Sequence, residues 1–127
     1  MERGLFLMEE GGQMRVIAVD FDGTLNNGKY PYIGEPNTDL IEYLKASRSN
    51  GDKVILWTCR EGELLQQAVD WCKGIGLEFD AVNENLPCMI ERYGTNPRKI
   101  GADLYIDDRN ALVTDFKLSK RGRGRKR

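Results

Sequence analysis

Two aspartates that follow a short apolar run are the residues best placed to do chemistry. Asp20 and Asp22 stand directly after Val16–Val19 and lead into Gly23 and Thr24. Two carboxylates this close repel each other, a cost that makes sense where a cation or a shared proton lies between them. An ordinary acidic turn does not require the apolar run, both acids and the Gly-Thr pair together. The segment therefore predicts an acidic site that holds a cation or a proton.

The apolar run before these acids indicates a buried strand. A run without polar alternation is typical of a strand covered on both faces, as in a parallel sheet. Further strand patterns occur at about 53 to 57, at 79 to 82 and at 104 to 106. Ligands bind where the strands of such sheets end.

Helical patterns separate the predicted strands. Asn37 or Thr38 suits the cap of a first helix, and Asn50-Gly51 supplies its end. A second helix carries apolar residues at helical spacing from 64 to 72, and a short helix is expected near 87 to 93. This alternation predicts the α/β class, as a single Rossmann-like, three-layer domain with a parallel sheet.

Polar side chains follow the end of each predicted strand. Because parallel strands end at one edge of their sheet, we expect these side chains to converge on one ligand. Lys99 stands before the last strand, where it can turn toward the acids, lower their repulsion and reach a phosphate. The predicted cluster contains Asp20, Asp22, Thr58, Arg60, Asn83, Asp107 and Asp108.

Four motifs in order resemble those of the haloacid dehalogenase-like superfamily. They are DFDGTL, the strand ending in Thr58, Lys99, and the IDD at 106 to 108, and the match covers roughly residues 14 to 110. Four motifs in order are far more specific than one. Most members of that superfamily are magnesium-dependent phosphatases, so the resemblance implies an enzyme of this kind.

Finer likenesses point to small members of the superfamily. The stretches WTCREGELL, NENLP and RKIGADLYIDDRN look like a group of small members without a cap domain, found in bacteria and their phages. The KIGADLYIDDR segment also resembles the 5′-nucleotidases for deoxynucleotides. The intervals between motifs leave no room for a cap domain, so we expect a capless core.

The resemblance implies a role for each acid. Asp20 is expected to attack phosphorus and form an aspartyl phosphate, and Asp22 to act as general acid and base. Mg²⁺ is the implied cofactor, bound by the Asp20 side chain, the Asp22 main-chain carbonyl and Asp107. Asp108 either binds a metal-bound water or orients Lys99, and the sequence leaves both roles open.

The same resemblance implies the residues that meet the phosphate. Thr58 is expected to donate its hydroxyl to a phosphate oxygen, and Lys99 to offset charge on the nucleophile and the phosphoryl group. Arg60 is expected to contact substrate, whereas Asn83, Glu84 and Arg109 are weaker candidates, since such residues near strand ends are commonly solvated or capping.

Residues 26 to 34 are expected to form a small flap beside the site. Tyr30 and Tyr32 of this flap either stack on a base or sugar or simply cover the end of the sheet. An open site of this kind leaves water exclusion to the flap, the substrate or another subunit.

Composition sets broad limits on the protein. The 127 residues contain 40% hydrophobic and 31% charged residues, typical of a soluble globular domain. No apolar run approaches the roughly 18 residues of a membrane span, so we expect a cytoplasmic protein that does not bind membranes. The three cysteines lack zinc or disulfide spacing, and Cys59 is interpreted as a packing residue. The absence of His excludes histidine-based triads.

Both ends differ from the predicted domain, which we place at residues 14–118. Residues 1–13 lack periodicity and are expected to be a disordered extension, with Met14 as the natural start. Residues 119–127 are expected to be a disordered basic tail. It holds six of the 19 Lys and Arg, leaving 13 against 20 Asp and Glu in the rest of the chain. The tail either touches nucleic acid or an acidic partner, or has no partner.

Two functions from different classes follow. The first is a magnesium-dependent phosphohydrolase, a phosphomonoesterase whose substrate is a phosphorylated small molecule such as a nucleotide, or a nucleic acid end. The alternative is a noncatalytic phosphate- or nucleic-acid-binding module. The sequence favours the enzyme, because binding alone does not require Asp22 beside Asp20. It does not indicate the oligomeric state.

Overall fold

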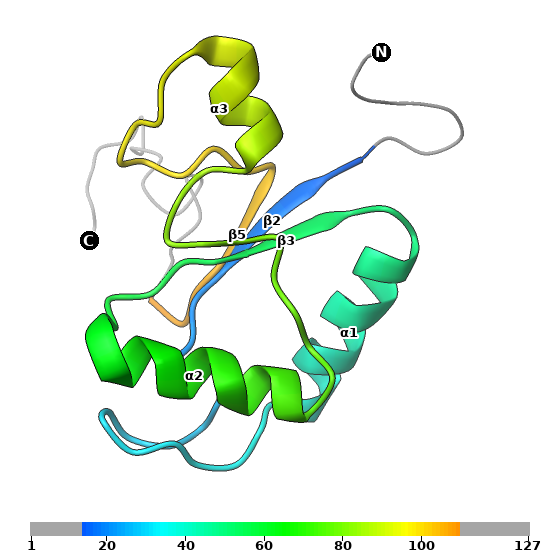
Figure 1. The fold of residues 1–127 in the computed structure, drawn as a ribbon. Helices are drawn as coiled ribbons and strands as arrows, with labels where there is room; N and C mark the ends of the chain where they lie inside the picture. Colours follow the sequence, from blue (N-terminus) through cyan, green and yellow to red (C-terminus); the bar gives the residue numbers. More distant parts are fainter. Residues whose placement is uncertain (1–13, 110–127) are drawn as a thin grey trace, which may run out of the picture.

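Four parallel strands form one sheet in the computed structural model, which describes residues 14–109 (Figure 1). The strand order is β4-β3-β2-β5. Within the sheet, Val19 lies opposite Leu56 on one side and opposite Ile106 on the other. The strands are β2 (Val16–Val19), β3 (Lys53–Leu56), β4 (Ala81–Val82) and β5 (Leu104–Ile106).

Three helices cover the two faces of this sheet. Figure 1 shows α1 (Thr38–Ser49) and α2 (Gly62–Gly74) on one side and α3 (Pro87–Tyr93) on the other. Side chains of β2 alternate between the two layers, so Ile17 packs in the core with α1 and α2, and Ala18 in the core with α3. The structure therefore confirms the predicted single Rossmann-like, three-layer α/β domain with a parallel sheet.

The ends of α1 follow the predicted capping residues. Asn37 is the N-cap of α1, and its side chain accepts a hydrogen bond from the backbone N–H of Leu40 at 3.5 Å. The same helix ends at Asn50, as predicted, and Gly51 follows with φ of 101°. Pro87 begins α3, and Gly94 ends it in the left-handed conformation.

The course of the chain reverses at β2. It runs from β2 to β3 and β4 on one side, and then β5 returns to the other side of β2. In open parallel sheets, the crevice at such a reversal is where ligands bind. Asp20 follows β2 directly and therefore stands at this crevice.

The third strand is shorter than predicted and contains only Ala81 and Val82. The preceding residue, Asp80, still donates its N–H to the Val54 carbonyl at 2.8 Å. Its carboxylate accepts from the Val54 N–H at 2.8 Å and from the guanidinium of Arg48 at 2.9 and 3.2 Å. Asp80 therefore joins the end of α1 to the sheet through its side chain.

Several predictions lie outside the described residues. They are the extension at 1–13, the last part of the 14–118 domain and the basic tail at 119–127. Within residues 14–109, no helix combines the length and apolar character needed to cross a membrane.

The Arg48–Asp80 pair gives a stability prediction. Burial raises the pKa of Asp80, but hydrogen bonds from Arg48 and Val54 and the charge of Arg48 outweigh burial, so the pKa lies below 3.8. The stabilisation that ionised Asp80 provides is therefore fully present above its unfolded-state pKa. It is lost as pH falls through its folded-state pKa. We expect Asp80→Asn to lower the free energy of unfolding by about 1–3 kcal/mol near neutral pH.

Urea unfolding near pH 7 and again near pH 3 measures this effect. As a control, Asp70→Asn changes an exposed α2 carboxylate that accepts a hydrogen bond from Gln66, and it should shift stability by less than about 0.5 kcal/mol. A cost for Asp80→Asn that persists undiminished at the acidic pH would contradict the assignment.

Candidate active site

Three carboxylates gather at the crevice beside β2. Asp20 follows β2, and Asp107 and Asp108 follow β5. The parallel register places these strand ends side by side, and the Asp20 N–H donates to the Ile106 carbonyl at 3.0 Å. One oxygen of each carboxylate lies within 4.8 Å of the others. The structure thus brings together these three predicted site residues, which we call the acidic cluster.

The acidic cluster changes the titration of Asp20. The pKa of Asp20 is raised from 3.8 to about 6, mainly by burial; a backbone hydrogen bond at Phe21 opposes this rise, and the charges of Asp107, Asp108 and Asp22 add to it. An ionised Asp20 is therefore costly unless a positive charge lies nearby. This is the environment in which a cation binds favourably to carboxylate oxygens.

The Gly-Thr turn fits directly against the acidic cluster. Thr24 is buried, and its hydroxyl oxygen accepts from the Asp108 N–H at 3.2 Å. Gly23 has φ of 76°, and a Cβ at this position would collide with the Asp108 carboxylate. The left-handed backbone favours glycine, and another residue here would also have to displace the Asp108 carboxylate. The turn after β2 and the end of β5 are fixed to each other by these contacts.

Asp22 points its carboxylate toward Arg60 in a bidentate ion pair. The Arg60 Nε lies 2.9 Å from Asp22 Oδ2, and Nη2 lies 2.7 Å from Oδ1. Arg60 is only 1% exposed. The prediction that Arg60 contacts substrate is wrong for this conformation, because a buried guanidinium held by a carboxylate has no face open to a ligand. The predicted metal contact through the Asp22 main-chain carbonyl stays a prediction.

Thr58 lies in a loop ordered by Asn83. The Asn83 side chain accepts from the Thr58 N–H at 2.8 Å and donates to the Arg60 carbonyl at 3.3 Å. The Thr58 hydroxyl oxygen accepts from the Arg60 N–H at 3.1 Å, which leaves its proton to be donated. Asn83 adopts a left-handed φ of 56°, which Asn tolerates better than most residues. Its role is therefore to position the loop that carries Thr58.

Lys99 faces the nucleophile candidate across a small cavity. The cavity has a volume of about 210 Å³, and Asp20, Asp107 and Lys99 line it together with Trp57 and Tyr105. Among the acids of residues 14–109, none forms an ion pair with Lys99. The structure thus places Lys99 in the same cavity as two of the predicted acids.

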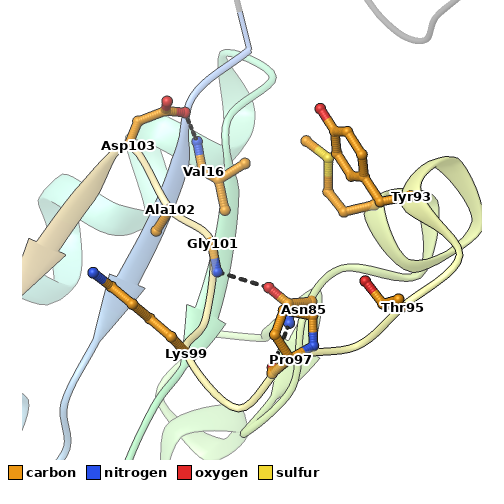
Figure 2. A pocket seen from close by; sticks show the side chains of 10 residues that line it. Val16, Asn85, Tyr93, Thr95, Pro97, Lys99, Gly101, Ala102 and Asp103 are labelled. Atoms are coloured by element: carbon orange, nitrogen blue, oxygen red, sulfur yellow. Dashed lines mark hydrogen bonds between the residues drawn. The ribbon is translucent and has the colours of Figure 1, made fainter.

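Asn85 holds the loop that presents Lys99. Its buried side chain accepts from the Gly101 N–H at 2.7 Å and donates to the Pro97 carbonyl at 3.0 Å. Figure 2 shows Lys99 pointing away from Asn85 and Thr95, and all three residues line a second cavity of about 500 Å³. Sequence reasoning missed this role of Asn85, because a buried amide that joins two loops has no local pattern.

The flap at residues 26–34 is held by a buried asparagine. Asn26 is fully buried, and its Oδ1 accepts from the N–H groups of Gly28 at 2.7 Å and Gly34 at 3.0 Å. A Cβ on either glycine would collide with the backbone of the other. Tyr30 covers the Arg60 guanidinium at 5.2 Å, whereas Tyr32 is 77% exposed. The structure therefore gives Tyr30 a packing contact, and stacking of either ring on substrate stays a prediction.

Trp57 is a candidate that sequence reasoning missed. Its ring is 39% exposed, lies 5.6 Å from the ring of Tyr105, and lines the cavity that contains Asp20. The predicted strand included residue 57, so Trp57 was interpreted as a strand residue. Its position just before Thr58, a predicted phosphate-binding residue, was the sequence feature that could have identified it as a site residue.

Comparisons with known proteins give one informative match. No family model matches the chain, and no curated protein matches it. A solved structure described as a conserved protein from Bacteroides thetaiotaomicron is 48% identical in sequence, with a TM-score of 0.69. The match covers 77% of this chain and 78% of that protein. At this identity and coverage, the chain belongs to the same family as the conserved Bacteroides protein.

Proposed function

We propose that the protein is a magnesium-dependent phosphohydrolase, a phosphomonoesterase that acts through an aspartyl phosphate on Asp20. The observation that supports this most is the cavity that Asp20 shares with Asp107 and Lys99. It combines a nucleophile, a second cation ligand and a positive side chain at the ligand-binding edge of the sheet. The resemblance of its four motifs to haloacid dehalogenase-like phosphatases points to the same chemistry.

The proposed reaction has two displacements at phosphorus. A carboxylate oxygen of Asp20 attacks the phosphorus, the bond from phosphorus to the leaving oxygen breaks, and protonated Asp22 gives that oxygen its proton. Asp22 then takes a proton from water, whose oxygen attacks the aspartyl phosphate. The second step releases inorganic phosphate and regenerates the Asp20 carboxylate.

The acidic cluster fits a magnesium ion. Its three carboxylates would supply the hard oxygen ligands that Mg²⁺ prefers, and burial together with the neighbouring acids makes an ionised Asp20 unfavourable without a positive charge. Asp20 and Asp107 would hold the ion, with the Asp22 main-chain carbonyl as the third predicted ligand. The bound ion would supply charge neutralisation between an anionic nucleophile and an anionic phosphate.

Lys99 and Thr58 would bind the phosphoryl group. Lys99 lines the cavity beside Asp20, and its ammonium is a positive charge of the kind that stabilises a transferring phosphoryl group. Thr58 keeps a hydroxyl proton to donate, because the contact from the Arg60 N–H uses only a lone pair of its oxygen. These residues act by positioning and charge, and neither needs to transfer a proton.

The nucleotide part of the proposal is supported by Trp57. An exposed indole beside the nucleophile offers a face on which a base can stack, a contact worth about 1–3 kcal/mol per base. We therefore infer that the substrate is a phosphate ester whose alcohol part carries an aromatic base, such as a nucleotide or a nucleic acid end.

Phosphate release tests the proposed activity. We expect Mg²⁺-dependent turnover from a panel of nucleotides, sugar phosphates and phosphorylated DNA or RNA ends, and loss of it in EDTA. Asp20→Asn should lower kcat by more than about a thousandfold, because it removes the nucleophile. Asp70→Asn, a change in an exposed α2 carboxylate outside the acidic cluster, should leave turnover unchanged.

A folded wild-type protein that binds magnesium but releases no phosphate across the panel would contradict the proposed phosphohydrolase activity. That result would favour the noncatalytic phosphate-binding module instead. Saturable binding of a nucleotide without turnover would then identify its ligand.

The pKa of Asp20 gives a second prediction, for the metal-free protein. Because the folded-state value of about 6 exceeds 3.8, protonated Asp20 favours folding, and this contribution is lost as pH rises through about 6. Asp20→Asn mimics the protonated acid. Its Tm relative to wild type should therefore increase between about pH 4 and pH 7.5.

Thermal unfolding in EDTA measures this difference. At the higher pH, Mg²⁺ should raise the Tm of the wild type more than that of Asp20→Asn, because the variant lacks a cation ligand. An identical difference in Tm at both pH values would contradict the raised pKa of Asp20 in the folded protein.

Substitution of Trp57 tests the substrate class. Trp57→Leu should lower kcat/KM for a nucleoside monophosphate by about 5- to 100-fold, the range that corresponds to the loss of one base-stacking contact. The same change should alter kcat/KM for glycerol phosphate much less, because that substrate has no ring. Trp57→Phe should retain most of the preference for the nucleoside monophosphate over glycerol phosphate. Equal losses of kcat/KM for both substrates in Trp57→Leu would contradict the stacking role.

A further inference from the structure

The guanidinium of Arg60 connects three parts of the molecule. Nε and Nη2 hold both carboxylate oxygens of Asp22, and Nη2 also donates to the Pro31 carbonyl of the flap at 3.0 Å. Nη1 donates to the Leu64 carbonyl in the first turn of α2 at 3.3 Å. One buried side chain therefore contacts the acid, the flap and a helix.

Aromatic rings enclose the same guanidinium. Its central carbon lies 4.9 Å from the centre of the Phe21 ring and 5.2 Å from that of Tyr30. The Arg60 side chain has no exposed surface, whereas the Asp22 side chain is 24% exposed. Removal of Tyr30 and Pro31 by a movement of the flap would expose the guanidinium to water. Water would then compete for the donors that hold Asp22.

The ion pair conflicts with the chemistry proposed for Asp22. A general acid must carry a proton and direct it to the leaving oxygen, but a bidentate pair with arginine engages both oxygens of the ionised carboxylate. The carboxylate of Asp22 also lies outside the group of acids that can share one cation. Asp22 therefore has to loosen or leave this pair before it can protonate a substrate.

We propose that Arg60 is a positioning residue that couples the flap to Asp22. While the flap covers the guanidinium, the ion pair holds Asp22 in a fixed orientation. When substrate displaces the flap, the pair weakens and Asp22 becomes available for proton transfer. The functional consequence rests on the proposed phosphohydrolase activity, but the physical coupling between Asp22 and the flap does not.

Limited proteolysis tests the coupling without any activity. Lys29 is an exposed trypsin site in the flap, and Lys73 is an exposed site near the end of α2. Asp22→Asn weakens the hold on Arg60, so cleavage after Lys29 should accelerate by at least about tenfold relative to cleavage after Lys73. Asp80→Asn is the matched control, since it disrupts the Arg48 ion pair away from the flap. It should accelerate cleavage at both sites alike.

A second variant keeps the test valid if Asp22→Asn alone fails to fold. Asp22→Asn leaves a buried guanidinium without its counter-charge, whereas Asp22→Asn combined with Arg60→Met removes both charges. The double variant also loses the donor to Pro31, so its flap should be cleaved faster as well. Selective acceleration at Lys29 in either folded variant supports the coupling. Unchanged relative cleavage at Lys29 in folded variants overturns it.

Kinetics then test the consequence for the reaction. Arg60→Lys keeps the charge but loses the bidentate geometry that fixes the orientation from which Asp22 is released, so we expect kcat to fall by about 10- to 100-fold with little change in KM. In the Asp22→Asn background the same change should cost less than about threefold, because Arg60 acts through Asp22. Equal losses in both backgrounds would overturn the positioning role. A wild type without phosphatase activity would reject the proposed function, and proteolysis would still decide the coupling.

Discussion

A buried guanidinium has to satisfy its N–H groups, and much of the region around Asp22 is arranged to do so. Arg60 lies under the flap with its side chain removed from solvent, where an unpaired charge would cost several kcal/mol. Asp22 supplies the counter-charge, and the Pro31 and Leu64 carbonyls accept further hydrogen bonds. The turn after β2, the flap and the start of α2 are held in place by this requirement.

A second constraint acts on the other side of β2. The carboxylates of Asp20, Asp107 and Asp108 lie close enough to share one cation, and burial with mutual repulsion raises the pKa of Asp20 to about 6. The two acids of the DFD segment therefore have opposite surroundings. Asp20 lacks a positive partner in the described structure, whereas Asp22 has one. This difference suits a proposed division of labour between a nucleophile at the cation site and an acid held apart from it.

Asparagine side chains position the loops that complete the site. Asn26 closes the neck of the flap, Asn83 orders the loop of Thr58, and Asn85 holds the loop of Lys99. Each amide carries both donor and acceptor atoms, so it satisfies backbone groups that a loop leaves unpaired. The site thus depends on short, directional contacts more than on regular secondary structure.

The sequence by itself determined the fold class and the convergence of Asp20, Asp107 and Asp108. Apolar runs and capping residues are local signals, so they predicted β2, β5 and α1 closely, and parallel strand ends meet at one edge of a sheet. Only the tertiary structure decided the partners of individual side chains. Arg60 was expected to contact substrate, because its burial depends on Asp22 and the flap, which are distant in sequence. The contacts of Asn26 and Asn85, and the exposure of Trp57, likewise follow from how separate loops pack, which no local pattern encodes.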